Sequence, residues 1–133
     1  MFKKFRHAIH LIAMAICITQ ASGCKGNDNI TSVSAIQFEQ KIKADSVQLL
    51  DVRTPQEFAS GHIKGAININ VQSVDFQQTA ENKLSKDSTI LVYCRSGRRS
   101  MKAADILSRI GYKVINLKGG IIDWENDGFP VTH

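Results

Sequence analysis

The residues most able to do chemistry lie in one short segment. It reads Cys94-Arg95-Ser96-Gly97-Arg98-Arg99-Ser100. Small residues let such a segment curl, so that successive backbone N–H groups point at the sulfur and form an anion-binding cradle. A thiolate is the reactive form of cysteine, and we expect a following helix N-terminus and nearby cations to lower the pKa of this thiol. Those cations are Arg95, Arg98, Arg99 and Lys102.

A buried, inert thiol is the alternative, because a free cysteine often acts as a small apolar residue. A charge run can likewise be a solvated helix face. Packing gives no reason for three arginines after Cys94, and the small residues beside it favour the cradle. The other cysteines, Cys17 and Cys24, fall near the N-terminus, so we expect no disulfide within the folded body.

Alternating strands and helices are predicted to position this segment. Apolar runs rich in β-branched residues predict strands over residues 30–33, 47–52, 66–69, 89–93 and 113–117. Periodicity and capping residues predict helices over 34–44, 55–60, 74–84 and 98–110, with a short one around Trp124. This alternation predicts an α/β fold, in which helices cover both faces of a mainly parallel sheet. Chemistry in such sheets lies beyond the carboxyl ends of the strands, where Cys94 falls.

Residues 1–23 are typical of a secretory signal peptide. Basic residues precede an apolar run over 8–19, which ends in small residues. The run has about a dozen residues, whereas a membrane-spanning helix needs roughly 20. Cys24 follows directly, as in a bacterial lipoprotein cleavage box, and we expect it to carry a lipid; ordinary signal-peptidase cleavage is the alternative.

These expectations divide the chain into a signal peptide (1–23), a lipidated tether (24–29) and a folded domain (30–133). We expect an exported protein of the cell envelope or periplasm, attached to a membrane through Cys24. Removing the signal peptide takes the formal net charge from +5 to +2, because that segment holds three basic and no acidic residues. The basic composition therefore does not indicate nucleic-acid binding. Nothing in the sequence indicates an oligomer, and we expect a monomer.

Several other polar residues have two possible roles. Asp51, Arg53 and Glu57 could form an acid/base group, but an ion-pair and hydrogen-bond set that fixes a strand-to-helix corner is favoured. His62 could move protons, but a structural histidine bonded to backbone is favoured. No set of side chains has metal-ligand spacing, so we expect neither a metal nor a cofactor. Gly119 and Gly120 predict a turn with unusual backbone angles.

Five ordered segments and one tryptophan form a recognisable set. They are Leu50-Asp51-Val52-Arg53-Thr54-Pro55-Gln56-Glu57-Phe58, Gly61-His62-Ile63-Lys64-Gly65-Ala66-Ile67-Asn68, Tyr93-Cys94-Arg95-Ser96-Gly97-Arg98-Arg99-Ser100, Leu117-Lys118-Gly119-Gly120-Ile121, Trp124 and Gly128-Phe129-Pro130-Val131. Together they resemble the rhodanese homology domain. The resemblance spans residues 30 to the end. It implies a three-layer α/β sandwich with a central parallel sheet of about five strands, and an active-site loop from Cys94 to Arg99.

The resemblance also implies a sulfurtransferase. Cys94 would take a sulfur atom from thiosulfate or a similar anion as a persulfide and pass it to a thiol or another thiophilic acceptor. Arg95 and Arg98 would hold the donor, Arg99 would close the loop, and Ser96, Gly97 and Ser100 would supply amides or hydroxyls.

Two other functions remain in view. A non-catalytic binding or sulfur-relay module is one, although many such domains lack the cysteine. A cysteine phosphatase or arsenate reductase is the other. In phosphatases of that type five residues separate the cysteine and the arginine, but only four separate Cys94 and Arg99.

Overall fold

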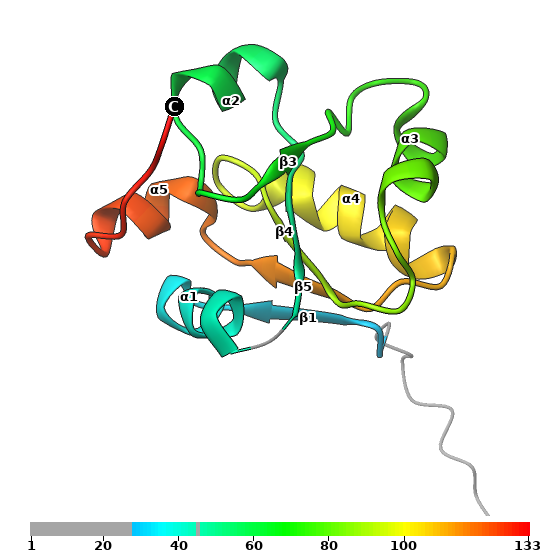
Figure 1. The fold of residues 1–133 in the computed structure, drawn as a ribbon, viewed down its shortest axis with the longest axis horizontal. Helices are drawn as coiled ribbons and strands as arrows, with labels where there is room; N and C mark the ends of the chain where they lie inside the picture. Colours follow the sequence, from blue (N-terminus) through cyan, green and yellow to red (C-terminus); the bar gives the residue numbers. More distant parts are fainter. Residues whose placement is uncertain (1–27, 45) are drawn as a thin grey trace, which may run out of the picture.

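Five parallel strands form one sheet in the order β1-β5-β4-β2-β3 (Figure 1). The computed structural model describes residues 28–44 and 46–133, so the predicted signal peptide and Cys24 lie outside the described residues. The strands are β1 (Ile30–Val33), β2 (Gln48–Asp51), β3 (Ile67–Asn68), β4 (Ile90–Tyr93) and β5 (Val114–Leu117). The predicted parallel α/β sandwich is confirmed.

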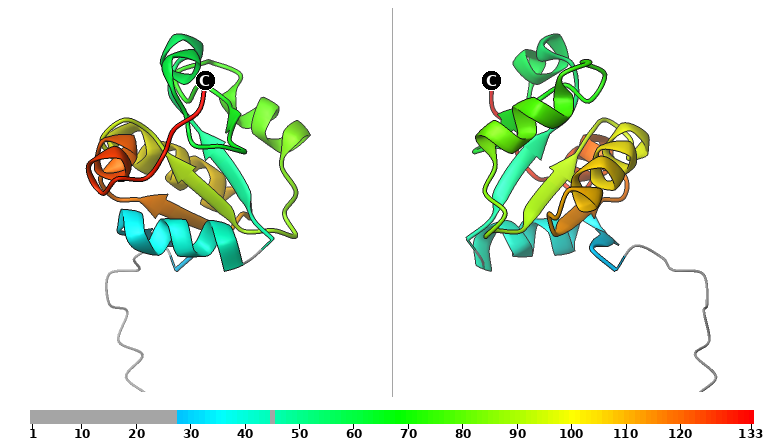
Figure 2. Two further views of the ribbon diagram at one scale, coloured as in Figure 1. Left: turned by 60° about the vertical axis from the view of Figure 1, so that its left-hand side comes forward. Right: turned by 90° about the vertical axis from the view of Figure 1, so that its right-hand side faces the viewer.

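Helices cover both faces of the sheet (Figure 2). They are α1 (Ala35–Ala44), α2 (Pro55–Ser60), α3 (Phe76–Lys83), α4 (Arg98–Arg109) and α5 (Gly120–Asn126). The α1 helix begins as the sequence predicts, because the Ser34 side chain accepts a hydrogen bond from the Gln37 amide while the Gln37 side chain accepts one from the Ser34 amide. Among the described helices, none is both long and apolar enough to cross a membrane.

The central strand β4 explains how one short run of residues serves two cores. Side chains of a strand alternate between the faces of its sheet. Ile90 and Val92 pack in the cluster that contains α3 and α4, whereas Leu91 and Tyr93 pack in the cluster that contains α1 and α5. Cys94 follows in the alternation and belongs to the α3 and α4 cluster. The sulfur is thus directed toward the start of α4.

Most predicted elements agree with the observed ones to within one residue at each end, and three predictions differ in other ways. The α3 helix begins at Phe76 rather than at residue 74, because Phe76 is buried and Val74 is fully exposed. The weak strand candidate at 66–69 shortens to two residues, which pair only with β2. Gly120 has the expected positive φ, 64°, but Gly119 has an ordinary φ of −99°.

Candidate active site

Cys94 directly follows β4, and α4 begins four residues later at Arg98. The β2 strand, which pairs with β4 in parallel, ends at the same edge and leads into α2. The loop after β4 and the corner after β2 therefore meet at the carboxyl edge of the sheet, where sites in such folds lie. The structure brings Cys94, Gly97 and Ser100 together, as the sequence predicts.

The sulfur of Cys94 lies in a buried cradle. The thiol is 1 % exposed, and its Sγ accepts a hydrogen bond from the Gly97 amide at 3.1 Å. The thiol donates to Ser100 Oγ at 3.4 Å, and the Ser100 hydroxyl donates to the Gly97 carbonyl oxygen at 3.1 Å. Because a serine hydroxyl can turn, it can also donate to the sulfur once the thiol has lost its proton.

This environment favours the thiolate. Burial raises the pKa of the Cys94 thiol, but hydrogen bonds from the Ser100 side chain and from three backbone amides lower it and outweigh burial. The amides are those of Ser96, Gly97 and Ser100. The net effect is a pKa below the ordinary value for cysteine. The sequence led us to expect that basic side chains would also lower this pKa. In the structure, the main causes that lower it are hydrogen bonds.

The start of α5 and the residues just before it hold the loop in its curled shape. The amide of Ile121 donates to the Cys94 carbonyl oxygen at 2.9 Å. Gly97 has a φ of 104°, and a β-carbon at this position would overlap the Lys118 carbonyl oxygen. A β-carbon on Gly120 would overlap the Arg95 carbonyl group. Glycine is therefore required at both positions, because the two backbones approach too closely for a side chain.

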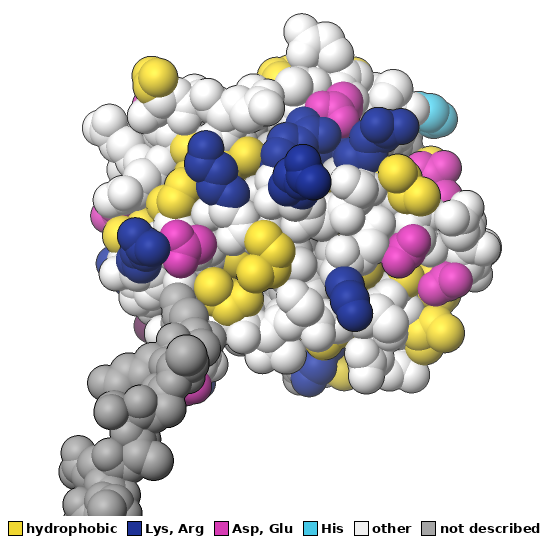
Figure 3. Space-filling view, turned by 180° about the vertical axis from the view of Figure 1, so that it is seen from behind, with side chains coloured by type: hydrophobic (Ala, Val, Ile, Leu, Met, Phe, Trp, Pro, Cys, Tyr) yellow, Lys and Arg dark blue, Asp and Glu magenta, His cyan; other side chains and the backbone are white. Residues whose placement is uncertain are grey.

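Two arginines of the loop are available to an anion. Arg95 and Arg98 are exposed, and neither makes an ion pair within residues 28–44 and 46–133. Figure 3 shows Lys and Arg side chains gathered on the face opposite to that of Figure 1. Ser96 and Lys102 are exposed as well.

Arg99 lies differently from its two neighbours. Its Nη1 and Nη2 donate to Oε1 and Oε2 of Glu57 at 2.7 and 2.9 Å, which joins the loop to α2. This pair lowers the pKa of Glu57 to about 2, with the Arg99 hydrogen bond as the main cause. The sequence predicts that Arg99 closes the loop, and in the structure the side chain of Arg99 bonds to Glu57 at the end of that loop. Sequence reasoning missed this partner, because no spacing rule connects residues 42 positions apart.

Asp51 and Arg53 form the corner that the sequence favoured. Arg53 donates from Nε and Nη2 to the Asp51 carboxylate, at 2.6 Å for the shortest contact, and both side chains are buried. Arg53 also donates to the Gly61 carbonyl oxygen and lies over the ring of Tyr93. These contacts fit a structural role. Grouping Glu57 with this corner was only partly right, because its carboxylate pairs with Arg99.

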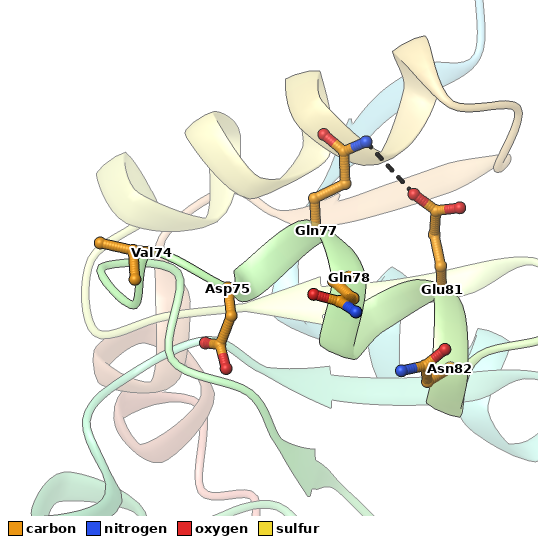
Figure 4. A pocket seen from close by; sticks show the side chains of 6 residues that line it. All are labelled: Val74, Asp75, Gln77, Gln78, Glu81 and Asn82. Atoms are coloured by element: carbon orange, nitrogen blue, oxygen red, sulfur yellow. Dashed lines mark hydrogen bonds between the residues drawn. The ribbon is translucent and has the colours of Figure 1, made fainter.

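The other features that we considered, namely His62, a metal site and a surface pocket, include no contact with the Cys94 cradle among the described residues. His62 Nδ1 contacts the Phe58 carbonyl oxygen at 2.9 Å, and its ring stacks on Phe58, which confirms a structural histidine. In the described part of the chain, no group of three or more His, Cys, Asp or Glu side chains could hold a metal ion. A surface pocket beside α3 is lined by polar side chains such as Gln77 and Glu81, and includes no residue of the cradle (Figure 4).

Comparison with known proteins agrees with this geometry. The chain matches the rhodanese-like domain over residues 34–127. It is 39% identical over 105 residues to a sulfurtransferase of Allochromatium vinosum, covering 77% of this chain and 95% of that protein. It is 39% identical over 74 residues to the thiosulfate sulfurtransferase PspE of Escherichia coli, covering 56% and 70% respectively.

The fold comparison points the same way. A crystal structure of a rhodanese-related protein from Thermoplasma volcanium has a TM-score of 0.68 and 34% identity, covering 76% of this chain and 96% of that one. The named relatives support a rhodanese-type sulfurtransferase as the general class of activity. The chain belongs to the rhodanese-like domain family.

Proposed function

We propose that this protein transfers a sulfane sulfur from thiosulfate or a similar small anion to a thiophilic acceptor, through a persulfide on Cys94. The observation that carries the proposal is the sulfur cradle, in which a buried thiol with a lowered pKa accepts a backbone N–H and contacts a serine hydroxyl. The thiolate is the nucleophilic form of cysteine, and a lowered pKa increases the fraction of thiolate at a given pH.

The first step forms the persulfide. The Cys94 thiolate attacks the outer sulfur of thiosulfate, the bond between the two thiosulfate sulfurs breaks, and sulfite leaves with the bonding electron pair. The charge before and after the step is the same. The amides that contact Sγ in the resting protein are suited to hold the negative charge of the persulfide.

The second step restores the thiolate. An acceptor, cyanide in an assay or a thiol in the cell, attacks the outer sulfur of the persulfide, and Cys94 leaves as the thiolate. A covalent intermediate of this kind gives ping-pong kinetics. Arg95 and Arg98, which are exposed at the loop, would bind the anionic donor before the first step.

The test is a thiosulfate:cyanide assay on the wild type and on Cys94→Ser. We expect turnover in the wild type, none in the variant, and a mass increase of one sulfur on the Cys94 peptide after incubation with thiosulfate. The control is Ser108→Ala. Ser108 lies on α4, as Ser100 of the cradle does, but near the other end of the helix, so this variant should keep its activity. Lack of both turnover and mass increase in the wild type would leave a binding or relay module as the better explanation.

A phosphatase or arsenate reductase is less well supported. Such enzymes bind a tetrahedral oxyanion with an arginine at the end of the loop, but both terminal nitrogens of Arg99 are held by Glu57. The shorter loop also offers fewer amides. Hydrolysis of p-nitrophenyl phosphate that depends on Cys94 would support this alternative instead.

We also propose that the protein is exported and acts as a monomer in the envelope or periplasm, anchored through a lipid on Cys24. The sequence features of residues 1–24 support this location. Intact-mass measurement of the mature protein separates lipidation from simple cleavage. A mature chain that begins at Cys24 with an added diacylglycerol is expected, and an unmodified N-terminus there would contradict the anchor.

A further inference from the structure

We propose that Glu57 sets the charge selectivity of the site for its sulfur donor, because it holds Arg99 in a neutral pair and leaves Arg95 and Arg98 as the free guanidinium groups of the loop. This inference rests on the proposed function. In the pair, two parallel N–H···O contacts of 2.7 and 2.9 Å use both terminal nitrogens of Arg99. An anionic donor therefore cannot form the same two-point contact with Arg99 while Glu57 is bound.

The carboxylate of Glu57 is oriented by its own helix. Its Oε1 accepts hydrogen bonds from the Thr54 amide and hydroxyl, at 3.3 and 3.1 Å, while the Thr54 hydroxyl accepts from the Glu57 amide. This reciprocal arrangement is a capping box at the start of α2. The capping box thus orients the Glu57 carboxylate toward Arg99 in the loop.

Arg99 is adjacent in sequence to the cradle, and its charge interacts with that of Cys94. It precedes Ser100, whose hydroxyl contacts Cys94 Sγ, and the Cys94 charge contributes to the raised pKa of Arg99 after the larger effects of Glu57 and burial. Its side chain is 24 % exposed in the pair. Without the Glu57 charge, Arg99 would add a third unpaired cation to the anion-binding side of the loop.

Two donors with the same sulfane sulfur but different charge measure this effect. Thiosulfate is a dianion, whereas benzenethiosulfonate is a monoanion. An added cation stabilises the bound dianion more than the bound monoanion. The ratio of kcat/KM for thiosulfate to kcat/KM for benzenethiosulfonate therefore reports the number of unpaired charges at the site, independently of general loss of activity.

Glu57→Gln removes the charge with little change in shape. Its side-chain oxygen can still accept from Thr54, since glutamine also completes a capping box. Glu39→Gln is the matched control, because Glu39 pairs with Lys43 within α1 and the overall charge changes equally. The double variant Glu57→Gln with Arg99→Gln removes both members of the pair and keeps the net charge of the wild type.

We expect the donor ratio to rise about threefold to tenfold in Glu57→Gln, as for an interaction of one partly exposed charge. The ratio should stay at the wild-type value in Glu39→Gln and return to it in the double variant. An unchanged ratio in Glu57→Gln would overturn the inference. A clear fall in the double variant would do so too, because it would mean that Arg99 binds the donor in the wild type.

A second measurement does not depend on sulfur transfer. The pH dependence of Cys94 alkylation by iodoacetamide, followed on the Cys94 peptide, gives the pKa of the thiol. We expect this pKa to fall in Glu57→Gln because the charge of Arg99 is no longer compensated, whereas a loosened cradle would raise it and contradict the inference. If the wild type transfers sulfur from neither donor, the proposed function fails and this pKa alone decides the role of Glu57.

Discussion

Two strand-to-helix connections meet at the carboxyl edge of the sheet, and they are built differently. In the corner between β2 and α2, Asp51 and Arg53 are buried and form an ion pair, and Arg53 also donates to the Gly61 carbonyl oxygen. In the loop between β4 and α4, the Cys94 sulfur is buried among hydrogen-bond donors, but Arg95 and Arg98 are exposed and unpaired with any described acid.

The difference separates stability from reactivity. The charged groups of the corner bond to each other, so we expect them to affect the stability of the folded protein rather than the binding of a substrate. The loop keeps hydrogen-bond donors and cations available for an incoming anion. Because these cations are unpaired with any described acid, contacts with neighbouring elements must fix the shape of the loop. The corner and α2 provide this support, because Glu57 reaches from α2 to Arg99 in the loop. Substitutions in the two regions should accordingly have different consequences.

The largest effect on stability should come from Arg53→Met. This change leaves the Asp51 carboxylate, which has no exposed surface, without its ion-pair partner. We expect a loss of about 3–5 kcal/mol in the free energy of unfolding, as for other broken buried pairs. Urea denaturation followed by circular dichroism measures it.

The control for the corner is Arg109→Met, which breaks an exposed pair with Asp105. We expect a change within about 0.5 kcal/mol there, as for most surface substitutions. Equal losses in the two variants would contradict a structural role specific to Arg53.

A substitution in the loop should affect both properties. Gly97→Ala requires a left-handed φ of a non-glycine residue and places a β-carbon against the Lys118 carbonyl. We expect a destabilisation of about 2–3 kcal/mol and loss of sulfur transfer, because the amide that bonds to the sulfur is displaced. Gly65→Ala is the matched control, since Gly65 also has a positive φ but open space around it. If Gly65→Ala lost as much activity, the overlap at residue 97 would not be the cause.

The cradle itself is tested by Ser100→Ala. Removal of the hydroxyl takes away one of the interactions that lower the pKa of Cys94, so this pKa should rise. The ascending limb of kcat/KM against pH should move to higher pH by the same amount. Ser108→Ala should leave that limb in place. A profile of Ser100→Ala that matches the wild type would show that the backbone amides suffice.

The sequence predicts the local geometry of the loop and of the corner, but not the contact that joins the loop to α2. The curled loop is predictable because Cys94, Gly97 and Ser100 are close along the chain, and local backbone rules govern such short segments. The Asp51 and Arg53 pair is predictable for the same reason. The contact between Glu57 and Arg99 depends on the packing of α2 against a loop far along the chain, which no helical or strand period describes. The start of α3 was missed because the burial of Phe76, not local propensity, fixes it.

The smallest expected effect is on stability, and it comes from the pH dependence of the Glu57 and Arg99 pair. The pKa of Glu57, lowered to about 2 by its bond to Arg99, means that the pair contributes stability above the ordinary pKa of 4.5, and that this contribution is lost as pH falls toward 2. We expect Glu57→Gln to be less stable than the wild type by up to about 1 kcal/mol at pH 7, because the pair is partly exposed. The two proteins should approach equal stability near pH 2. Glu39→Gln, which removes the same charge from a pair within α1, is the control for the change in net charge. A stability difference between Glu57→Gln and the wild type that stays constant from pH 7 to 2 would mean that α2 depends on the shape of residue 57 rather than on its charge.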